Sequence, residues 1–378
     1  MKEYYVILTG SKNNAGDFLI KYRAKQLFSS LRPDRDIIDL NAWEPFDSDR
    51  LEIINRSKAL ILMGGPALQK NMRPKIYPLC DRLQDIHTPI LMMGIGWKSI
   101  RGTWADTHTY KLNQKTEELL ERVKSTPFQS SVRDYHTQNT LYVRGLRNVL
   151  MTGCPACYDL DHLNENCHFF ENKPDKVAFS MGVAFRQSHS MEIQMKNIIM
   201  ELKKRYGSKL KVAFHHSLER NKYIDPRITE RDCQFADWLQ RNDIPFKDIS
   251  GSAKGLIDFY SDAQLHIGYR LHAHLFMCST SKPSILIAED GRGKAIKDVL
   301  GGIVLDGYET YQNTLLAKIV RKTRLVKLDR FKPNEHLFDQ LVYSLENEEN
   351  TNYHRCLSTR NQINHNYKIM EKFMAQLP

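Results

Sequence analysis

Short apolar runs recur along the chain, and the stretches between them have the length and period of helices. The first series of runs covers residues 4–9, 59–63, 89–94 and 128–132. A second series covers residues 176–181, 211–215, 263–267, 283–288 and 302–305. Apolar runs that alternate with helical patterns are typical of β-α-β units, so the chain is predicted to be an α/β protein with two parallel sheets.

A polar stretch at residues 161–174, rich in Asn and Glu, separates the two series. We interpret it as a linker between domains. Two Rossmann-like domains that face a cleft are therefore expected, at residues 1–165 and 175–335. Residues 336–378 have a mostly helical pattern, and the last helix is expected to cross back over the first domain.

The composition limits the classes of protein to which the chain can belong. Its 378 residues are 41% hydrophobic, enough for two domains with cores of their own, and no run of about 18 apolar residues marks a membrane span. The first residues lead directly into a predicted strand, which favours a cytoplasmic protein over one with a signal peptide. The net charge of +11 favours phosphorylated substrates or peripheral contact with an anionic membrane. Nucleic acid is not expected, because the chain lacks an arginine-rich tract, an RNP-type strand and zinc-finger spacing.

The segment Gly268-Tyr-Arg-Leu-His-Ala-His274 follows an alternating, strand-like run. It places a cation, Arg270, two residues before a titratable imidazole, His272. Open α/β sheets bind ligands at the carboxyl ends of their strands, and a guanidinium fits a carboxylate or a phosphate. The segment therefore predicts an anion site. The alternative is that Arg270 pairs with a structural carboxylate and His272 is a satisfied core histidine.

Three turns that contain glycine end strands of the first predicted sheet, at Gly10 to Gly16, at Gly64-Gly65 and at Gly94-Ile-Gly96. Turns of this kind let backbone approach a ligand closely, and a helix start offers free amides to an anion. We expect the turns to form one rim. Arg133 and Asp134 extend that rim or form a structural ion pair, and Asp17 is a candidate for the N-cap of the helix that follows.

More cations and imidazoles follow strands of the second predicted sheet. They are Arg186, His215, His216 and Lys294. All four are candidates for the same cleft as Arg270, with a solvated loop or a mobile lid as the alternative.

Seven cysteines, an odd and scattered number, favour reduced thiols over a disulfide framework. Cys154 and Cys157 have the spacing of a redox or zinc pair. Further metal-ligating side chains lie downstream, at His162, Cys167 and His168. A second pair and regular finger spacing are missing, so buried thiols are favoured and no metal is predicted.

Several short motifs together resemble the polysaccharide pyruvyl transferase family. They are Asn14-Ala-Gly-Asp17, Gly64-Gly65, Gly94-Ile-Gly96, Ser131-Val-Arg-Asp134 and Gly268-Tyr-Arg-Leu-His272. Arg186 and Lys294 also lie where the family carries cations. Two positions depart from the family pattern: Cys154 replaces the aspartate of Asp-Pro-Ala, and Met63-Gly-Gly-Pro66 lacks a third glycine.

The resemblance implies a GT-B-like fold and an enzyme that moves pyruvate from phosphoenolpyruvate onto a sugar. The acceptor would belong to a cell-surface polysaccharide or its lipid-linked precursor, and the product would be a pyruvate ketal. No cofactor or metal is needed for this reaction. The implied catalytic residues are His272, Arg270 and Asp17. The implied donor-binding residues are Arg186, Arg270, His272, Lys294 and His215, and the acceptor-side residues are Asn14, Gly16, Gly65, Gly96 and Arg133.

Two other functions remain open at this stage. A glycosyltransferase with the same fold would turn its cations towards the diphosphate of a nucleotide sugar, with Glu289 or Asp290 on the ribose hydroxyls. An inactive scaffold of a polysaccharide pathway would explain the cysteine at position 154. The sequence leaves the acceptor sugar and the oligomeric state open.

Overall fold

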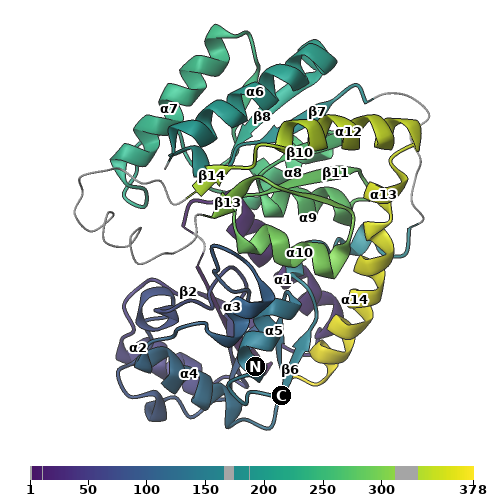
Figure 1. Ribbon diagram of the computed structural model, residues 1–378. Helices are drawn as coiled ribbons and strands as arrows, with labels where there is room; N and C mark the ends of the chain where they lie inside the picture. Colours follow the sequence, from purple (N-terminus) through teal and green to yellow (C-terminus); the bar gives the residue numbers. More distant parts are fainter. Residues whose placement is uncertain (1, 11, 166–173, 187, 311–330) are drawn as a thin grey trace.

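Figure 1 shows the computed structural model, which describes residues 2–10, 12–165, 174–186, 188–310 and 331–378. Two lobes are stacked, and both chain termini lie in the lower one. The predicted linker lies mostly outside the described residues, so the domain boundaries stay predictions.

The lower lobe contains a parallel sheet of four strands in the order β2-β1-β3-β4. The strands are β1 (Tyr4–Thr9), β2 (Asp36–Asn41), β3 (Leu60–Met63) and β4 (Ile90–Met93). A parallel pair, β5 (Ser130–Val132) and β6 (Val149–Met151), lies beside β4. The hydroxyls of Ser130 and Ser131 join β5 to β4, because they accept hydrogen bonds from the amides of Met92 and Gly94, both at 3.0 Å.

Helices of the lower lobe lie between these strands along the chain. They are α1 (Ala15–Leu31), α2 (Ser48–Asn55), α3 (Trp104–His108), α4 (Gln114–Lys124) and α5 (Tyr135–Tyr142). The N-cap of α1 is Asn14, whose side chain accepts a hydrogen bond from the amide of Gly16 at 3.3 Å. The prediction that Asp17 is the N-cap was wrong, because Asp17 already lies within the first turn.

The upper lobe contains a parallel sheet of six strands in the order β12-β11-β10-β7-β8-β9. The strands are β7 (Val177–Ser180), β8 (Leu210–Phe214), β9 (Phe246–Asp248), β10 (Leu265–Gly268), β11 (Ser284–Ala288) and β12 (Ile303–Asp306). The helices between them are α6 (His189–Tyr206), α7 (Pro226–Arg241), α8 (Ala253–Ser261), α9 (Leu271–Ser279) and α10 (Gly291–Leu300). A short antiparallel pair is formed by β13 (Tyr308–Thr310) and β14 (Phe331–Pro333).

Each sheet has a point at which the chain reverses its direction across the strands. In the upper sheet the chain moves outward from β7 to β9 and restarts at β10, beside β7. In the lower sheet it moves from β1 to β2 and restarts at β3, on the other side of β1. Ligands of open α/β sheets bind beyond the carboxyl ends of the strands at such points. The residues that follow β1, β3, β7 and β10 are therefore placed for binding.

The lobes meet along the carboxyl ends of their strands. The backbone and side chain of Asn13 bridge them, because its Oδ1 accepts from the amide of Ser217 at 3.0 Å and its carbonyl accepts from the amide of Gly251 at 2.7 Å. Elsewhere Gly102 lies against Gly291 so closely that a Cβ on Gly102 would be 2.4 Å from the Gly291 Cα. Only glycine permits this approach, and Gly102 also has a φ of +66°.

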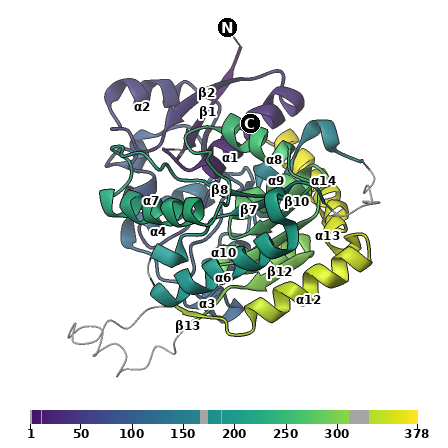
Figure 2. The same ribbon diagram turned by 90° about the horizontal axis from the view of Figure 1, so that it is seen from above.

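The C-terminal helices tie the two lobes together. They are α12 (Leu337–Asn350), α13 (His354–Leu357) and α14 (Thr359–Ala375). Figures 1 and 2 show them running along one side of the upper lobe and down to the lower one. There Arg32 donates to the carbonyls of Leu377 and Met374, at 2.8 and 3.2 Å. The predicted return of the C-terminal helices to the first domain is confirmed.

Candidate active site between the lobes

The first turns of three helices and the end of one strand converge between the lobes. They bring together Asp17 of α1, His272 of α9 and Arg292 of α10, with Arg133 directly after β5. At Gly16 a Cβ would lie 2.2 Å from Nδ1 of His272, so the absence of a side chain lets α1 reach the imidazole.

A small space opens at this convergence, which we call the narrow cavity. Its volume is about 30 Å³, close to the room that one water molecule needs. Its lining consists of Asn14, His215, Tyr269, Arg270, Leu271, His272, Leu286, Ala288, Glu289, Asp290, Arg292 and Gly293. Polar and charged side chains from both lobes therefore share one confined space.

Arg270 is held by the end of β7, across the point at which the upper sheet reverses. Its backbone amide donates to the Ser180 hydroxyl at 2.9 Å, and its Nε donates to the Met181 carbonyl at 2.6 Å. Burial lowers the pKa of its guanidinium to about 10, while the nearby Glu289 acts in the opposite direction. Arg270 is therefore a positioned cation at neutral pH.

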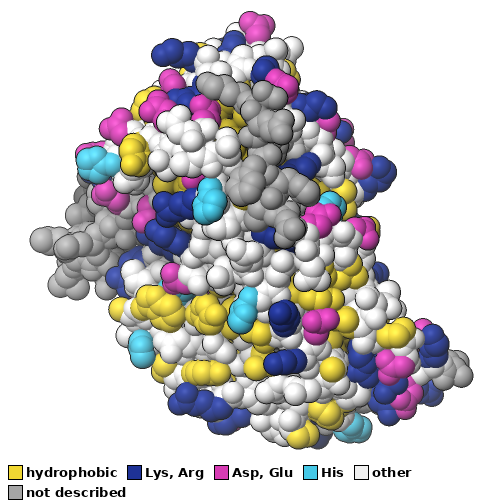
Figure 3. Space-filling view, turned by 90° about the vertical axis from the view of Figure 1, so that its right-hand side faces the viewer, with side chains coloured by type: hydrophobic (Ala, Val, Ile, Leu, Met, Phe, Trp, Pro, Cys, Tyr) yellow, Lys and Arg dark blue, Asp and Glu magenta, His cyan; other side chains and the backbone are white. Residues whose placement is uncertain are grey.

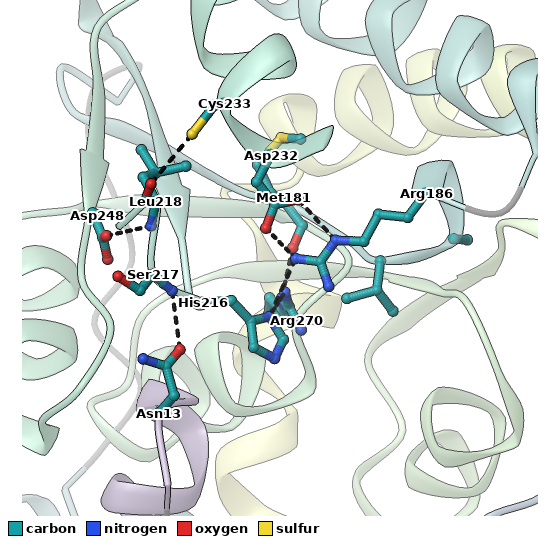
Figure 4. A network of polar contacts seen from close by, with 12 residues as sticks. Asn13, Met181, Arg186, His216, Ser217, Leu218, Asp232, Cys233, Asp248 and Arg270 are labelled. Carbon is teal, nitrogen blue, oxygen red and sulfur yellow. Dashed lines mark hydrogen bonds and ion pairs between the residues drawn. The ribbon is translucent and has the colours of Figure 1, made fainter. Parts of the chain in front are cut away.

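Two of the hydrogen-bond donors of the upper lobe meet at His216 (Figure 4). Arg270 Nη2 lies 2.8 Å from His216 Nδ1, and Arg186 Nη2 lies 3.5 Å from the same atom. Burial, together with the charges of both arginines, lowers the pKa of His216 to about 2, so its ring is neutral and accepts. Arg186 also donates hydrogen bonds to both carboxylate oxygens of Asp232, from Nε to Oδ1 at 2.7 Å and from Nη2 to Oδ2. Arg186 thus lies near Arg270, but its Nε and Nη2 are engaged.

His272 is a neutral imidazole with an unused nitrogen. Only 7% of it is exposed, and its Nε2 has no hydrogen-bond partner among the described residues. Burial lowers its pKa well below the ordinary value, and the charges of Arg133, Arg292 and Arg270 lower it further. The interpretation of His272 as a satisfied core histidine does not hold for Nε2.

Arg133 is buried, and part of its guanidinium makes no hydrogen bond to a described residue. It is 1% exposed and packs on Gly96, where a Cβ would lie 2.0 Å from its Nε. Its Nε is 3.6 Å from the Asp134 carboxylate, which mainly caps α5 by accepting from the amide of Thr137 at 2.7 Å. Neither Nη1 nor Nη2 finds a partner in the part of the chain that the structure describes. A buried charge without full pairing is costly, and an anion beside it would relieve that cost.

Three of the predicted donor-side residues have structural partners. His215 Nε2 lies 2.7 Å from the Tyr260 hydroxyl, and its ring is neutral because burial lowers its pKa. Lys294 forms an ion pair with Asp306 at 3.4 Å and lies over the ring of Tyr308, outside the lining of the narrow cavity. Their predicted roles in donor binding stay predictions, as does that of Arg186.

Arg292 was missed by the sequence analysis. Its guanidinium lines the narrow cavity and pairs with Asp290, the N-cap of α10, with Nη2 to Oδ2 at 2.6 Å. Glu289 accepts hydrogen bonds from the amides of Val183 and Ala184 at 2.6 and 3.1 Å. Both carboxylates that were considered for ribose hydroxyls are therefore occupied. The signal for Arg292 was its place just after a strand, within the first turn of a helix.

A second space, which we call the wide cavity, lies on the lower-lobe side of Asp17. It has a volume of about 320 Å³ and occupies the point at which the lower sheet reverses, between the ends of β1 and β3. Its lining is Thr9, Gly10, Lys12, Asp17, Ile20, Lys21, Trp43, Met63, Gly64, Gly65, Pro66, Ala67, Gln69, Lys75, Ile76, Tyr77 and Lys98. Of the predicted acceptor-side residues, Gly65 lines it, whereas Asn14 lines the narrow cavity, and Gly16 and Gly96 cover His272 and Arg133.

Asp17 stands between the two cavities, with a carboxyl whose environment is mixed. Burial raises its pKa. The opposing influences are its hydrogen bond with Asn14 and the charges of Arg292, Arg133 and Arg270. The net shift is upward, which is the direction that suits a group that exchanges protons near neutral pH.

The cysteine pair lies in the core. Cys154 and Cys157 are free and buried, and burial raises the pKa of the Cys154 thiol to about 11. Cys167 and His168 lie outside the described residues. Within the described residues no group of three or more His, Cys, Asp or Glu side chains is arranged to hold a metal ion.

The chain is similar to known proteins in its sequence and in its fold. A model of the family described as polysaccharide pyruvyl transferase matches residues 14–291. The chain belongs to this family. The match includes Arg133, Arg270 and His272 and most of the lining of both cavities, whereas Arg292 and Lys294 lie just beyond its end. Family membership makes the protein a transferase of polysaccharide biosynthesis.

Solved structures agree on the fold. A UDP-GlcNAc 2-epimerase from Neisseria meningitidis bound to UDP-GlcNAc is 10% identical, with 98% of this chain and 99% of that chain covered and a TM-score of 0.57. The S. aureus MnaA-UDP structure is also 10% identical, with 97% and 94% covered and a TM-score of 0.55. The predicted fold, α/β and GT-B-like with two Rossmann-like lobes, is confirmed. No protein of curated function matches the chain.

Proposed function

We propose that this protein transfers the pyruvyl group of phosphoenolpyruvate to two hydroxyls of a saccharide and forms a ketal. The observation that carries the proposal is that Nη1 and Nη2 of Arg133 and Nε2 of His272 are buried and have no partner among the described residues. Arg133, which the sequence analysis placed on the acceptor side, takes a donor-side role in this proposal. Arg270 and Arg292 add two further guanidinium groups. Phosphoenolpyruvate carries a carboxylate and a phosphate, both of which suit bidentate arginines.

The balanced reaction needs no metal or redox partner. A proton adds to the methylene carbon of phosphoenolpyruvate, and one sugar oxygen forms a bond to its central carbon. A second sugar oxygen then displaces inorganic phosphate from that carbon. The two hydroxyls release two protons, one of which balances the methyl group that forms and the other of which leaves with phosphate or solvent.

His272 and Asp17 take the proton-transfer roles in this proposal. His272 is neutral while the site is empty, because burial and three arginines disfavour its charged form. An anion beside those arginines offsets their charge, raises the pKa of His272 and lets the ring carry a proton to the methylene carbon. Asp17, on the border of the wide cavity, accepts a hydroxyl proton of the acceptor.

Phosphoenolpyruvate is larger than the narrow cavity, which holds about 30 Å³. Donor binding in this proposal therefore separates the first turns of α9 and α10 from that of α1. The contacts that would yield are the bridge between Asn13 and Ser217 and the close approach of Gly102 to Gly291. Opening and closing of two lobes around a ligand is a common hinge motion.

Localisation and acceptor presentation belong to the same proposal. No helix among the described residues has the length and apolar character to cross a membrane. On the face drawn in Figure 3, Lys and Arg side chains are interspersed with Asp and Glu side chains. A cytoplasmic enzyme that reaches lipid-linked acceptors by peripheral contact fits the net charge of +11, and this contact stays a prediction.

The test is a calorimetric titration with phosphoenolpyruvate, and with a panel of nucleotide sugars, on the wild-type and Arg270→Ala proteins. We expect saturable binding of phosphoenolpyruvate that Arg270→Ala abolishes, with the variant still folded by circular dichroism. Unchanged binding in the folded variant would refute the donor site. Binding of nucleotide sugars alone would identify a glycosyltransferase instead.

A further inference from the structure

The wide cavity has more positive than negative side chains. Four lysines line it, and Asp17 is the one carboxylate among its lining residues. Two of the lysines have local partners, because Lys21 pairs with Asp39 at 2.7 Å and Lys12 lies 5.3 Å from the centre of the Trp43 ring. The remaining two lysines in the lining are Lys75 and Lys98.

Neither Lys75 nor Lys98 forms an ion pair with any residue that the structure describes. Lys98 is fixed by its backbone, which donates to the Leu68 carbonyl at 3.0 Å and accepts from the Tyr110 hydroxyl at 2.8 Å. Burial lowers the pKa of its ammonium, and the charges of Arg292 and Lys75 lower it further. A ligand anion between these lysines would offset that mutual repulsion.

An aromatic surface lies across the same cavity. Trp43 lines it and meets Tyr223 of the upper lobe, with ring centres 5.4 Å apart and an interplanar angle of 62°. Aromatic faces pack well against the apolar faces of sugar rings, and the rigid ring loses little entropy on binding. Asp17 is on the side of the cavity that faces His272.

We propose that the wide cavity binds a saccharide that carries an anionic group, with the anion between Lys75 and Lys98 and a sugar ring against Trp43. The anion is a phosphate or diphosphate on the sugar, or a carboxylate of an acidic sugar. The inference rests on the proposed function for the reacting hydroxyl, which it places near Asp17. The cation pair is independent of that assignment.

The experiment uses Arg270→Ala protein, so that the donor site does not contribute, and titrates it with inorganic pyrophosphate, glucuronate and neutral methyl glucoside. We expect one of the two anions to bind and to bind more tightly than methyl glucoside. Lys98→Met and Lys75→Met should each weaken that binding about tenfold or more, since each removes a charged hydrogen-bond donor. Lys98→Arg should retain it.

The matched control is Lys70→Met, a change of an exposed lysine from the same loop region that does not line the cavity. It should leave anion binding unchanged. Preference for pyrophosphate assigns the diphosphate source, and preference for glucuronate assigns the carboxylate source. The inference is overturned if neither anion binds, or if binding is the same in Lys75→Met, Lys98→Met and Lys70→Met.

A separate titration distinguishes this inference from the proposed function. Proteins with Arg270 intact and Lys75→Met or Lys98→Met should still bind phosphoenolpyruvate. Anion binding in the wide cavity without any phosphoenolpyruvate binding would refute the proposed donor and leave the lysine pair in place. Phosphoenolpyruvate binding without anion binding in the wide cavity would refute the role of the lysine pair and leave the proposed donor in place.

Discussion

The two cavities lie on opposite sides of the first turn of α1, and they use different cations. The narrow cavity holds about 30 Å³ and is surrounded by arginines and a neutral histidine. The wide cavity holds about 320 Å³ and is lined by lysines, aromatic rings and glycine turns. Each lies where its own sheet reverses direction.

This difference indicates a division of labour. A guanidinium is planar, permanently charged and geometrically matched to carboxylate and phosphate, so buried arginines suit a compact anion in one fixed orientation. A lysine is a point charge on a flexible stem, which tolerates ligands of varied shape. The narrow cavity is therefore suited to the donor and the wide cavity to a larger acceptor. Asp17 lies at the boundary, where the two substrates would meet.

The largest effect that would separate the cavities is expected from His272→Asn. Turnover should fall by about 10²- to 10⁴-fold, because a group that transfers a proton in the transition state is removed. Anion binding in the wide cavity should not change. The measurement is release of inorganic phosphate at saturating phosphoenolpyruvate, with thermal unfolding as the control for folding. A folded variant with full turnover would remove His272 from the mechanism.

Arg133→Gln tests the narrow cavity through its affinity for phosphoenolpyruvate. Phosphoenolpyruvate binding should weaken about 10- to 100-fold, as expected for the loss of a charged hydrogen-bond donor. The free energy of unfolding of the ligand-free protein should stay equal or rise, because an incompletely paired buried charge is removed. Calorimetry and thermal unfolding measure the two quantities.

The control for Arg133 is Arg73, which is similarly buried but has hydrogen-bond partners for both Nη1 and Nη2. Its Nη1 donates to Glu118 at 3.0 Å, and its Nη2 donates to the carbonyls of Cys80 and Asp81 at 2.9 and 2.7 Å. Arg73→Gln should lower the free energy of unfolding by about 1–3 kcal/mol and leave donor affinity unchanged. If Arg133→Gln behaves like Arg73→Gln, Arg133 is a structural residue.

The smallest expected effect is the uptake of protons when phosphoenolpyruvate binds. His272 is neutral in the empty site because its pKa is lowered, and a bound anion raises that pKa, so phosphoenolpyruvate binding at pH 7.5 should take up a fraction of a proton. Titrations in buffers of different ionisation enthalpy measure this uptake, and His272→Asn should eliminate it. Anion binding in the wide cavity should take up none through His272. Net proton release that the variant does not alter would contradict the assignment.

The strands show how far pattern alone reaches. All nine apolar runs are strands in the structure, because buried parallel strands need continuous apolar sequence. The strands β2, β6, β9, β13 and β14 were missed. Of these, β2 and β9 lie at the edges of the two large sheets, where every residue is at least partly exposed and the sequence is as polar as Asp36-Ile-Ile-Asp-Leu-Asn41. The other three are only three residues long. The cap of α1 was misassigned for a related reason. Asn14 and Asp17 are both good caps, and only backbone geometry chooses between them.

By itself the sequence determined the α/β class, the family motifs and the positions of Arg270 and His272 after a strand. The tertiary structure alone decided which charges are paired. It engages Arg186 with Asp232, leaves two nitrogens of Arg133 without a partner among the described residues, and places Lys75 and Lys98 in the lining of one cavity. The physical reason is that pairing depends on distances between side chains from different elements. Strand order and lobe contact set those distances, and neither can be read from local sequence.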